Sequence, residues 1–381
     1  MKKHKLLVIF VFCLSALFFG TVAHGFETSD LQGNWHIFGT EVNPNLPAVY
    51  WLYGDIDVDA SGNISSGTYY LPNGTSVALT SGQLALDPNG VITGSFEAGA
   101  VLSATVVHGK MDQNKTYGAS VIIGSDNTMD FTTQIKGGGT FSPTDIQGDW
   151  YAYNTVIDAT TGAVFWAYGI LSVDGSGNVT GTFYAPDGTP VTVTDGTAAL
   201  DSEGMITGSY TLSTEDTVAI SHGKLDQAKT FGVYVGVDPE SGSLGNVYLV
   251  KAGGTFQQQD VVGNWYIYGL FIDPSTPAVF WVYGKARNGA SGNLNGFYIL
   301  PTGDRIDVTG LGTMDSDGVW TGTFDLSTGD TAISPSTKLD QGKTSLVGVT
   351  INPDTYAMGF WQFIKGSFGI VPAIPFLIMG D

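Results

Sequence analysis

The sequence predicts an all-β protein made of three tandem antiparallel up-and-down β-barrel units of about eight strands each. Three observations predict this class. A unit of 115 residues occurs three times, each unit contains segments of hairpin length, and Gly-rich turns separate those segments. The segments are rich in Val, Ile, Thr, Tyr and Phe, which is typical of strands.

The 115-residue repeat begins with a Gly-x-Trp tripeptide, whose tryptophans are Trp35, Trp150 and Trp265. A second tryptophan follows in each unit, and a Lys-x-Asp-Gln segment lies further on. Because many positions agree at nearly constant spacing, we infer that one structural unit is present in three copies.

A shorter period within each unit predicts the strands. Gly54, Gly82 and Gly109 recur about every 27 residues, which suits one hairpin with its turns. Three hairpins, an opening strand and a closing strand give eight strands, and a closed meander leaves no exposed edge. A six-bladed β-propeller is the alternative, although its period would be half a unit. A single outer-membrane barrel of 24 strands is a further alternative, which the short turns disfavour.

The predicted domains are a signal peptide at 1–25 and barrel units at 26–141, 142–256 and 257–381, the last with an apolar C-terminal tail. Each copy is expected to own a complete core, so a fragment of residues 142–256 is expected to fold alone. The tail, from Phe368 to Met379, is too short and too interrupted by prolines to span a bilayer. No membrane span is therefore expected in the mature chain.

The mature chain is acidic and has no cysteine. Without the three lysines of the signal peptide, the 15 basic and 35 acidic residues give a net charge of −23. Such a charge repels phosphate backbones, so nucleic-acid binding is not expected. Cys13 lies in the signal segment, which excludes disulfides, thiol nucleophiles and Cys-ligated zinc from the mature protein.

Gly-x-Trp at the start of an eight-stranded meander resembles the lipocalin and avidin barrels. In lipocalins this Trp packs at the closed end of the barrel, and a basic residue of the last strand lies across it. The resemblance therefore implies a small apolar-ligand cup at the open end. It covers one tripeptide and the strand count, and the unit is shorter, lacks a flanking helix and has Lys where Arg is usual. The matching Trp–Lys pairs are Trp35 with Lys136, Trp150 with Lys251, and Trp265 with Lys365.

Each unit also carries a Trp and a Tyr two residues apart, which share one face of a strand. Such pairs can stack on sugar rings or grip an apolar ligand. The competing interpretation is that they fill the core, because a repeat must retain its core positions to fold. The candidate binding pairs are Trp51 with Tyr53, Trp166 with Tyr168, and Trp281 with Tyr283.

The other polar motifs have structural interpretations. Lys110 and Asp112 share a strand face and are expected to form an ion pair that fixes a turn. Asp315–Gly318 suggests calcium, but no complete twelve-residue loop is present, so an Asx turn is preferred and no cofactor is predicted. His108 and His222 recur, whereas the third unit has no histidine there. No catalytic motif is found, although paired carboxylates for glycoside cleavage need not form one.

The leading functional hypothesis is an exported, non-enzymatic binding or surface-interaction protein. Three units supply valency for a small apolar molecule or a glycan. The expected location is extracellular, at the cell surface or in the periplasm. A self-assembling extracellular structural protein and an enzyme acting on an extracellular polymer are the alternatives.

The exported protein should lack the first 25 residues. Lys2, Lys3 and Lys5 precede an apolar run, and Ala23 and Gly25 place small residues where a signal peptidase reads. N-terminal sequencing of exported material should therefore start at Phe26 or close to it. A chain that still begins with Met1 would contradict this.

Overall fold

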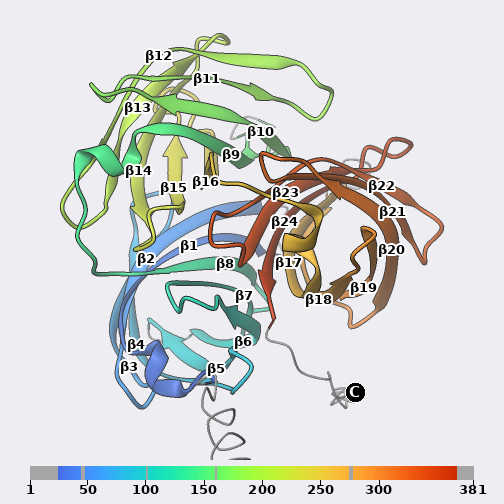
Figure 1. Cartoon of the computed structure of the whole chain (residues 1–381). Helices are drawn as coiled ribbons and strands as arrows, with labels where there is room; N and C mark the ends of the chain where they lie inside the picture. Colours follow the sequence, from blue (N-terminus) through green and yellow to red (C-terminus); the bar gives the residue numbers. More distant parts are fainter. Residues whose placement is uncertain (1–24, 44–47, 100–101, 159–160, 274–277, 367–381) are drawn as a thin grey trace, which may run out of the picture.

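Three closed eight-stranded antiparallel barrels make up the protein in a computed structural model (Figure 1). The structure describes residues 25–43, 48–99, 102–158, 161–273 and 278–366. The signal segment and the apolar tail lie outside these residues. The predicted all-β class and meander topology are confirmed, and neither a propeller nor a single barrel of 24 strands is formed.

Strands follow chain order around each barrel, and the first and last strands pair to close it. Barrel 1 consists of β1 (Gly33–Asn43), β2 (Ala48–Val58), β3 (Ile64–Tyr70), β4 (Ser76–Leu86), β5 (Val91–Ala98), β6 (Leu102–Met111), β7 (Tyr117–Gly124) and β8 (Met129–Lys136). Barrel 2 consists of β9 (Gly148–Ile157), β10 (Val164–Val173), β11 (Val179–Tyr184), β12 (Pro190–Leu200), β13 (Ile206–Leu212), β14 (Thr217–Leu225), β15 (Phe231–Val237) and β16 (Leu244–Lys251). Barrel 3 consists of β17 (Gly263–Asp273), β18 (Ala278–Asn288), β19 (Asn293–Ile299), β20 (Arg305–Met314), β21 (Val319–Leu326), β22 (Thr331–Leu339), β23 (Ser345–Ile351) and β24 (Met358–Lys365). A single 3₁₀ turn precedes each barrel, namely η1 (Thr28–Leu31), η2 (Pro143–Ile146) and η3 (Gln258–Val261).

The turns between strands follow the local chemistry that the sequence predicts. After β2, Oδ1 of Asp59 accepts hydrogen bonds from the backbone N–H of Ser61 at 2.8 Å and of Asn63 at 2.9 Å. Gly62 has a φ of +84°, and a Cβ there would lie 2.0 Å from the carbonyl oxygen of Leu84. Only glycine fits this position, so the Asx turn fixes the hairpin register.

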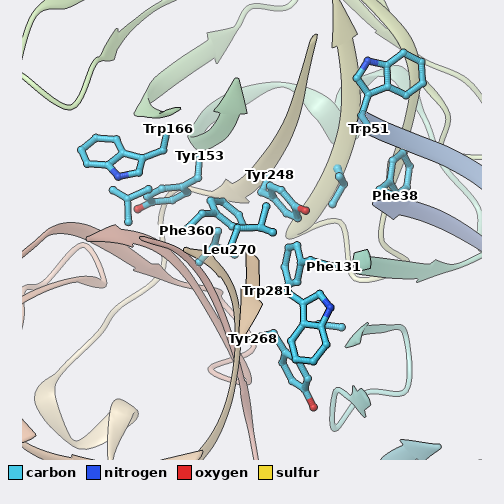
Figure 2. Close-up of a cluster of buried hydrophobic side chains, with 14 of the residues drawn as sticks. Phe38, Trp51, Phe131, Tyr153, Trp166, Tyr248, Tyr268, Leu270, Trp281 and Phe360 are labelled. Carbon is cyan, nitrogen blue, oxygen red and sulfur yellow. The ribbon is translucent and has the colours of Figure 1, made fainter. Parts of the chain in front are cut away.

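Strand alternation gives each barrel two apolar faces. On β1, Trp35 faces the interior of barrel 1, whereas Phe38 faces the other two barrels. The outward residues of all three barrels join in one buried cluster at the centre of the molecule (Figure 2). The barrels therefore share a fourth core in addition to the three that they enclose.

The centre of this shared core is built from aromatic residues of the last strand of each barrel. Phe131 of β8 and Phe360 of β24 occupy the same place in their barrels, with ring centroids 6.0 Å apart, and Tyr248 of β16 lies 4.6 Å from Phe360. Polar groups fix the register of the contact. Nδ2 of Asn246 donates to the carbonyl oxygen of Gly39 in barrel 1 at 2.9 Å.

The contacts between the barrels are cyclic, because the first strand of each barrel contacts the sixth strand of the next barrel. Equivalent positions on the first strands of the barrels contact equivalent positions on the sixth strands. Tyr268 Oη lies 2.7 Å from Nδ1 of His108, Tyr153 Oη lies 2.8 Å from Oγ of Ser336, and the Phe38 ring lies 5.5 Å from the His222 ring. Head-to-tail contacts that close after three steps define an approximate threefold axis.

The fragment of residues 142–256 should keep strand-rich circular dichroism but self-associate. Its interior cluster lies within the fragment except for Phe141, whereas Tyr153, Trp166 and Tyr248 lose the neighbours that bury them in the whole chain. Large exposed apolar patches drive association. Analytical ultracentrifugation should show oligomers, and Tyr248→Thr, which introduces the residue of barrel 1 at this position, should reduce them. A monodisperse monomer would show that the shared core contributes little.

Candidate functional site

The predicted aromatic binding pairs lie between the barrels and not inside them. Trp51, Trp166 and Trp281 are 4%, 1% and 2% exposed within the shared core (Figure 2). The Trp166 Nε1–H donates to the carbonyl oxygen of Thr350 in barrel 3 at 3.0 Å.

Their tyrosine partners Tyr53, Tyr168 and Tyr283 pack against the same cluster and stay partly exposed. Tyr53 stacks on His222 of barrel 2 with ring centroids 4.7 Å apart. The pairs therefore join barrels, and a ligand could approach them only from the tyrosine side. Their role in ligand binding stays a prediction.

The predicted Trp–Lys pairs lie at one end of each barrel. Each Trp is directly opposite its Lys in the register of the first and last strands. The Nζ atoms of Lys136, Lys251 and Lys365 lie 5.2, 5.0 and 5.4 Å from the ring centroids of Trp35, Trp150 and Trp265.

A second layer covers this end. Nζ of Lys251 also donates to the carbonyl oxygen of Asp145 at 2.7 Å, and the Trp150 indole N–H donates to that of Ile146 at 2.7 Å. Both acceptors belong to the preceding 3₁₀ turn, so Trp and Lys together hold η2 across the barrel end. The other two barrels repeat these contacts.

The Lys-x-Asp segments complete the closed ends, but not through the expected ion pair. Nζ of Lys110 lies 4.3 Å from the ring centroid of Phe26, and Lys115 pairs with Asp30 at 2.7 Å. Asp112 instead accepts backbone N–H bonds from Asn114, Thr116 and Tyr117. Its carboxylate thereby holds a tight turn in which Lys115 has a φ of +61°.

The aspartates that hold these turns are buried and interact electrostatically with one another. Burial, together with the charge of Asp340, raises the pKa of Asp112 to about 6. Burial, together with the charges of Asp112 and Asp340, raises the pKa of Asp226 to about 6. Backbone hydrogen bonds act in the opposite direction, because they stabilise the ionised carboxylate.

The barrel interiors differ, and two of them contain cavities. Barrel 3 encloses a cavity of about 360 Å³, which seven aromatic side chains help to line. Eight polar side chains also line it, among them Asp330 and Asn352. The seven aromatic residues are Phe271, Phe280, Tyr298, Trp320, Phe324, Trp361 and Phe363.

Barrel 1 encloses a smaller cavity of about 100 Å³, whose walls are mostly Ile, Leu and Val. The cavity extends from Trp35 at the closed end to Glu41, Tyr69 and Asp130 near the other end. Glu41 and Asp130 are directly opposite in the register of β1 and β8. Burial, followed by the charge of Glu41, raises the pKa of Asp130 well above its usual range.

In barrel 2, larger side chains occupy the corresponding space. Tyr234 stands where barrel 1 has Ser120 and barrel 3 has Gly348 in the same strand register. Its hydroxyl is 3.0 Å from that of Tyr210, and both side chains are buried. Differences at equivalent positions therefore decide which barrels are hollow. The repeat pattern in the sequence does not identify these residues, because they differ between the three copies.

The turn at Asp315 has the geometry expected of an Asx turn. Oδ1 of Asp315 accepts the backbone N–H of Asp317 and Val319 at 3.0 and 2.8 Å. Asp174 does the same with Ser176 and Asn178. Within the described residues, no three His, Cys, Asp or Glu side chains are placed to hold a metal. The helices there are single 3₁₀ turns, and none has the length and apolarity of a membrane span.

No family model matches the sequence, and no match was found among curated proteins. Among solved structures, transferrin-binding protein B of Haemophilus parasuis, a double mutant, matches with a TM-score of 0.30 and 12% identity over 89% of this chain and 76% of that one. HpuA of Kingella denitrificans, solved with human haemoglobin, matches with a TM-score of 0.27 and 13% identity over 63% of this chain and 95% of that one. Such low scores support no conclusion about relationship or partner.

Removing the charge at a closed end should destabilise its barrel less than removing the ring. Lys251→Met keeps the aliphatic stem but loses a cation–π contact and a hydrogen bond, which together contribute about 1–2 kcal/mol. Trp150→Ala should lower the free energy of unfolding by about 3–5 kcal/mol, because it leaves a cavity. Chemical denaturation of both variants tests this order. A Lys251→Met variant as stable as the wild type would show that the charge is dispensable.

Acidification should weaken the contact between barrels 1 and 3. Burial, followed by the charge of Lys285, lowers the pKa of His108 to about 3. A folded-state pKa below the unfolded value gives stability that is present above pH 6.5 and is lost as pH falls. Between pH 6.5 and 5 this loss is about 2 kcal/mol. Asp112 and Asp226 act with the opposite sign between pH 6 and 4, because their pKa values are raised.

The variant His108→Ser isolates the histidine contribution, because Ser336 is the equivalent residue of barrel 3. Urea denaturation at pH 8, 6.5 and 5 should give a smaller decrease in stability for the variant below pH 6.5. The two proteins should show the same pH dependence between pH 8 and 7, where histidine is neutral in both states. Parallel curves over the whole range would contradict the assignment to His108.

Proposed function

We propose that this chain is an exported, non-enzymatic binding protein that holds small apolar molecules inside barrels 3 and 1. The observation that carries the proposal is the cavity of about 360 Å³ in barrel 3. Its size and its largely apolar lining with several polar groups match small-molecule sites in general. The basic, apolar N-terminal segment supports export.

The lining of the barrel 3 cavity favours a flat aromatic ligand. Trp320 and Trp361 lie in the wall together with five Phe and Tyr rings, and such walls bind other rings by offset or edge contacts. A ligand that loses about 150 Å² of apolar surface gains on the order of 4 kcal/mol.

Most polar side chains of the cavity wall already bond to other protein groups: Thr328 donates to Asp330, and Ser334 pairs with Thr337. Nε1 of Trp320 is buried and has no hydrogen-bond partner, so it offers one donor. Asp330 already accepts a bond from Nδ2 of Asn352 at 3.3 Å. A sugar would leave most of its hydroxyl groups without partners, which is costly. The cavity therefore favours a small apolar ligand over a glycan.

Binding of the neutral fluorescent probe N-phenyl-1-naphthylamine tests the proposal. One probe molecule should bind per chain in barrel 3, with emission enhanced by the apolar surroundings. Ala332→Phe should weaken binding at least tenfold, about 1.4 kcal/mol, because Ala332 lines the cavity. Ala104→Phe is the matched control, since Ala104 holds the same register position in barrel 1. It should leave the affinity unchanged, and equal effects of both substitutions, or no binding, would contradict the proposal.

A further inference from the structure

Two carboxylates lie opposite each other at the mouth of the barrel 1 cavity. Glu41 and Asp130 both line the cavity from neighbouring strands. Oδ1 of Asp130 is buried and has no hydrogen-bond partner. No Lys, Arg or His is among the described residues that line the cavity, so two carboxylates face a largely apolar space without a cation from these residues. The barrel 3 cavity also has two aspartates in its lining, Asp273 and Asp330, but Asp330 accepts hydrogen bonds from Thr328 and Asn352.

Comparison of the three copies shows that the fold does not need this pair. The position of Glu41 is taken by Val156 in barrel 2 and by Phe271 in barrel 3, counted from the Trp that starts each barrel. Opposite Phe271, in the place of Asp130, is Gly359. Since the same barrel closes without either carboxylate, their presence in barrel 1 is not explained by folding.

The burial of Glu41 and Asp130 beside each other is energetically unfavourable when both carboxylates are ionised. Burial, followed by the charge of Asp126, raises the pKa of Glu41, and Asp130 is shifted in the same direction by burial and by Glu41. Tyr69, the remaining titratable group of the lining, has its pKa raised to about 12 by burial and by these carboxylates. A cation placed between Glu41 and Asp130 would remove the repulsion and supply the missing donor.

We infer that barrel 1 binds a small organic ammonium ion, with its apolar body in the cavity and its charged group between Glu41 and Asp130. This inference rests on the proposed function, since it specifies the ligand of one of the two cups. The cavity of about 100 Å³ limits the apolar body to roughly one ring, because an engineered cavity of about 150 Å³ holds benzene. An ammonium group donates up to three hydrogen bonds, which suits two carboxylates.

A metal ion fits the site less well. Calcium takes six to eight oxygen ligands, whereas most of the lining here is aliphatic. No three acidic or histidine side chains of the described residues are placed to hold a metal. A shared proton between the two carboxyl groups is the structural alternative, and it predicts no preference for a cationic ligand.

Methyl NMR of the mature chain with two isosteric compounds tests the inference. The compounds are 2-phenylethylamine and 2-phenylethanol. They differ only in their polar group, which is a charged ammonium in the first and a neutral hydroxyl in the second. Methyl groups of Leu79 and Ile92 report on barrel 1, and those of Leu294 and Ile306 report on barrel 3. At pH 7.5 the amine should bind barrel 1 at least tenfold more tightly than the alcohol. Any preference for the amine in barrel 3 should be smaller, because both carboxylate oxygens of Asp330 already accept hydrogen bonds.

Asp130→Asn combined with Glu41→Gln should abolish the preference while preserving side-chain shape. In the wild type, affinity for the amine should fall as pH is lowered from 7.5 to 5, because protonated carboxyls lose the ion pair. If both compounds bound barrel 1 equally, or if only the alcohol bound it, the inference would be overturned while the proposed function would remain intact. Absence of shifts in both barrels with both compounds would overturn both proposals. Since the amine–alcohol comparison uses the wild-type chain, it decides the question even if the double variant fails to fold.

Discussion

Burial of the outer faces of three barrels against one another is the interaction on which the rest of the structure depends. Isolated eight-stranded barrels need an apolar face only on the inside. Here Phe131, Tyr248 and Phe360 add a common core outside them. Since the contacts close around an approximate threefold axis, no copy of the contact surface is left unpaired. One consequence is that the seventh strand of each barrel, β7, β15 or β23, is buried along most of its length.

This arrangement separates what the copies share from what distinguishes them. The shared core and the Trp–Lys closed ends use repeated residues, so they hold three similar barrels in fixed relation. The interiors are free to diverge, because each barrel fills its own space independently. Tyr234 fills barrel 2, whereas Ser120 and Gly348 at the same position leave barrels 1 and 3 hollow. The three repeated barrels thus contain two cavities with different walls.

The repeat and the turn residues sufficed to predict the fold and the strand count. The Trp35–Lys136 contact could also be predicted, because first and last strands of a closed meander are antiparallel neighbours. The position of Trp51 could not. Alternation shows that Trp51 and Tyr53 share a face, but it does not say whether that face lies inside the barrel or against another barrel. The cups were missed for a related reason, since a cavity depends on side-chain volumes across strands that are distant in sequence.

Diffraction from crystals of the mature chain under xenon pressure tests the central claim most directly, because xenon enters apolar cavities and scatters anomalously. The account predicts xenon inside barrel 3, beside Trp320 and Phe324, and inside barrel 1, beside Leu79 and Ile92. It predicts none inside barrel 2, where Tyr210 and Tyr234 fill the space. Xenon found between the barrels next to Trp51, Trp166 and Trp281, with none inside barrels 1 and 3, would contradict it.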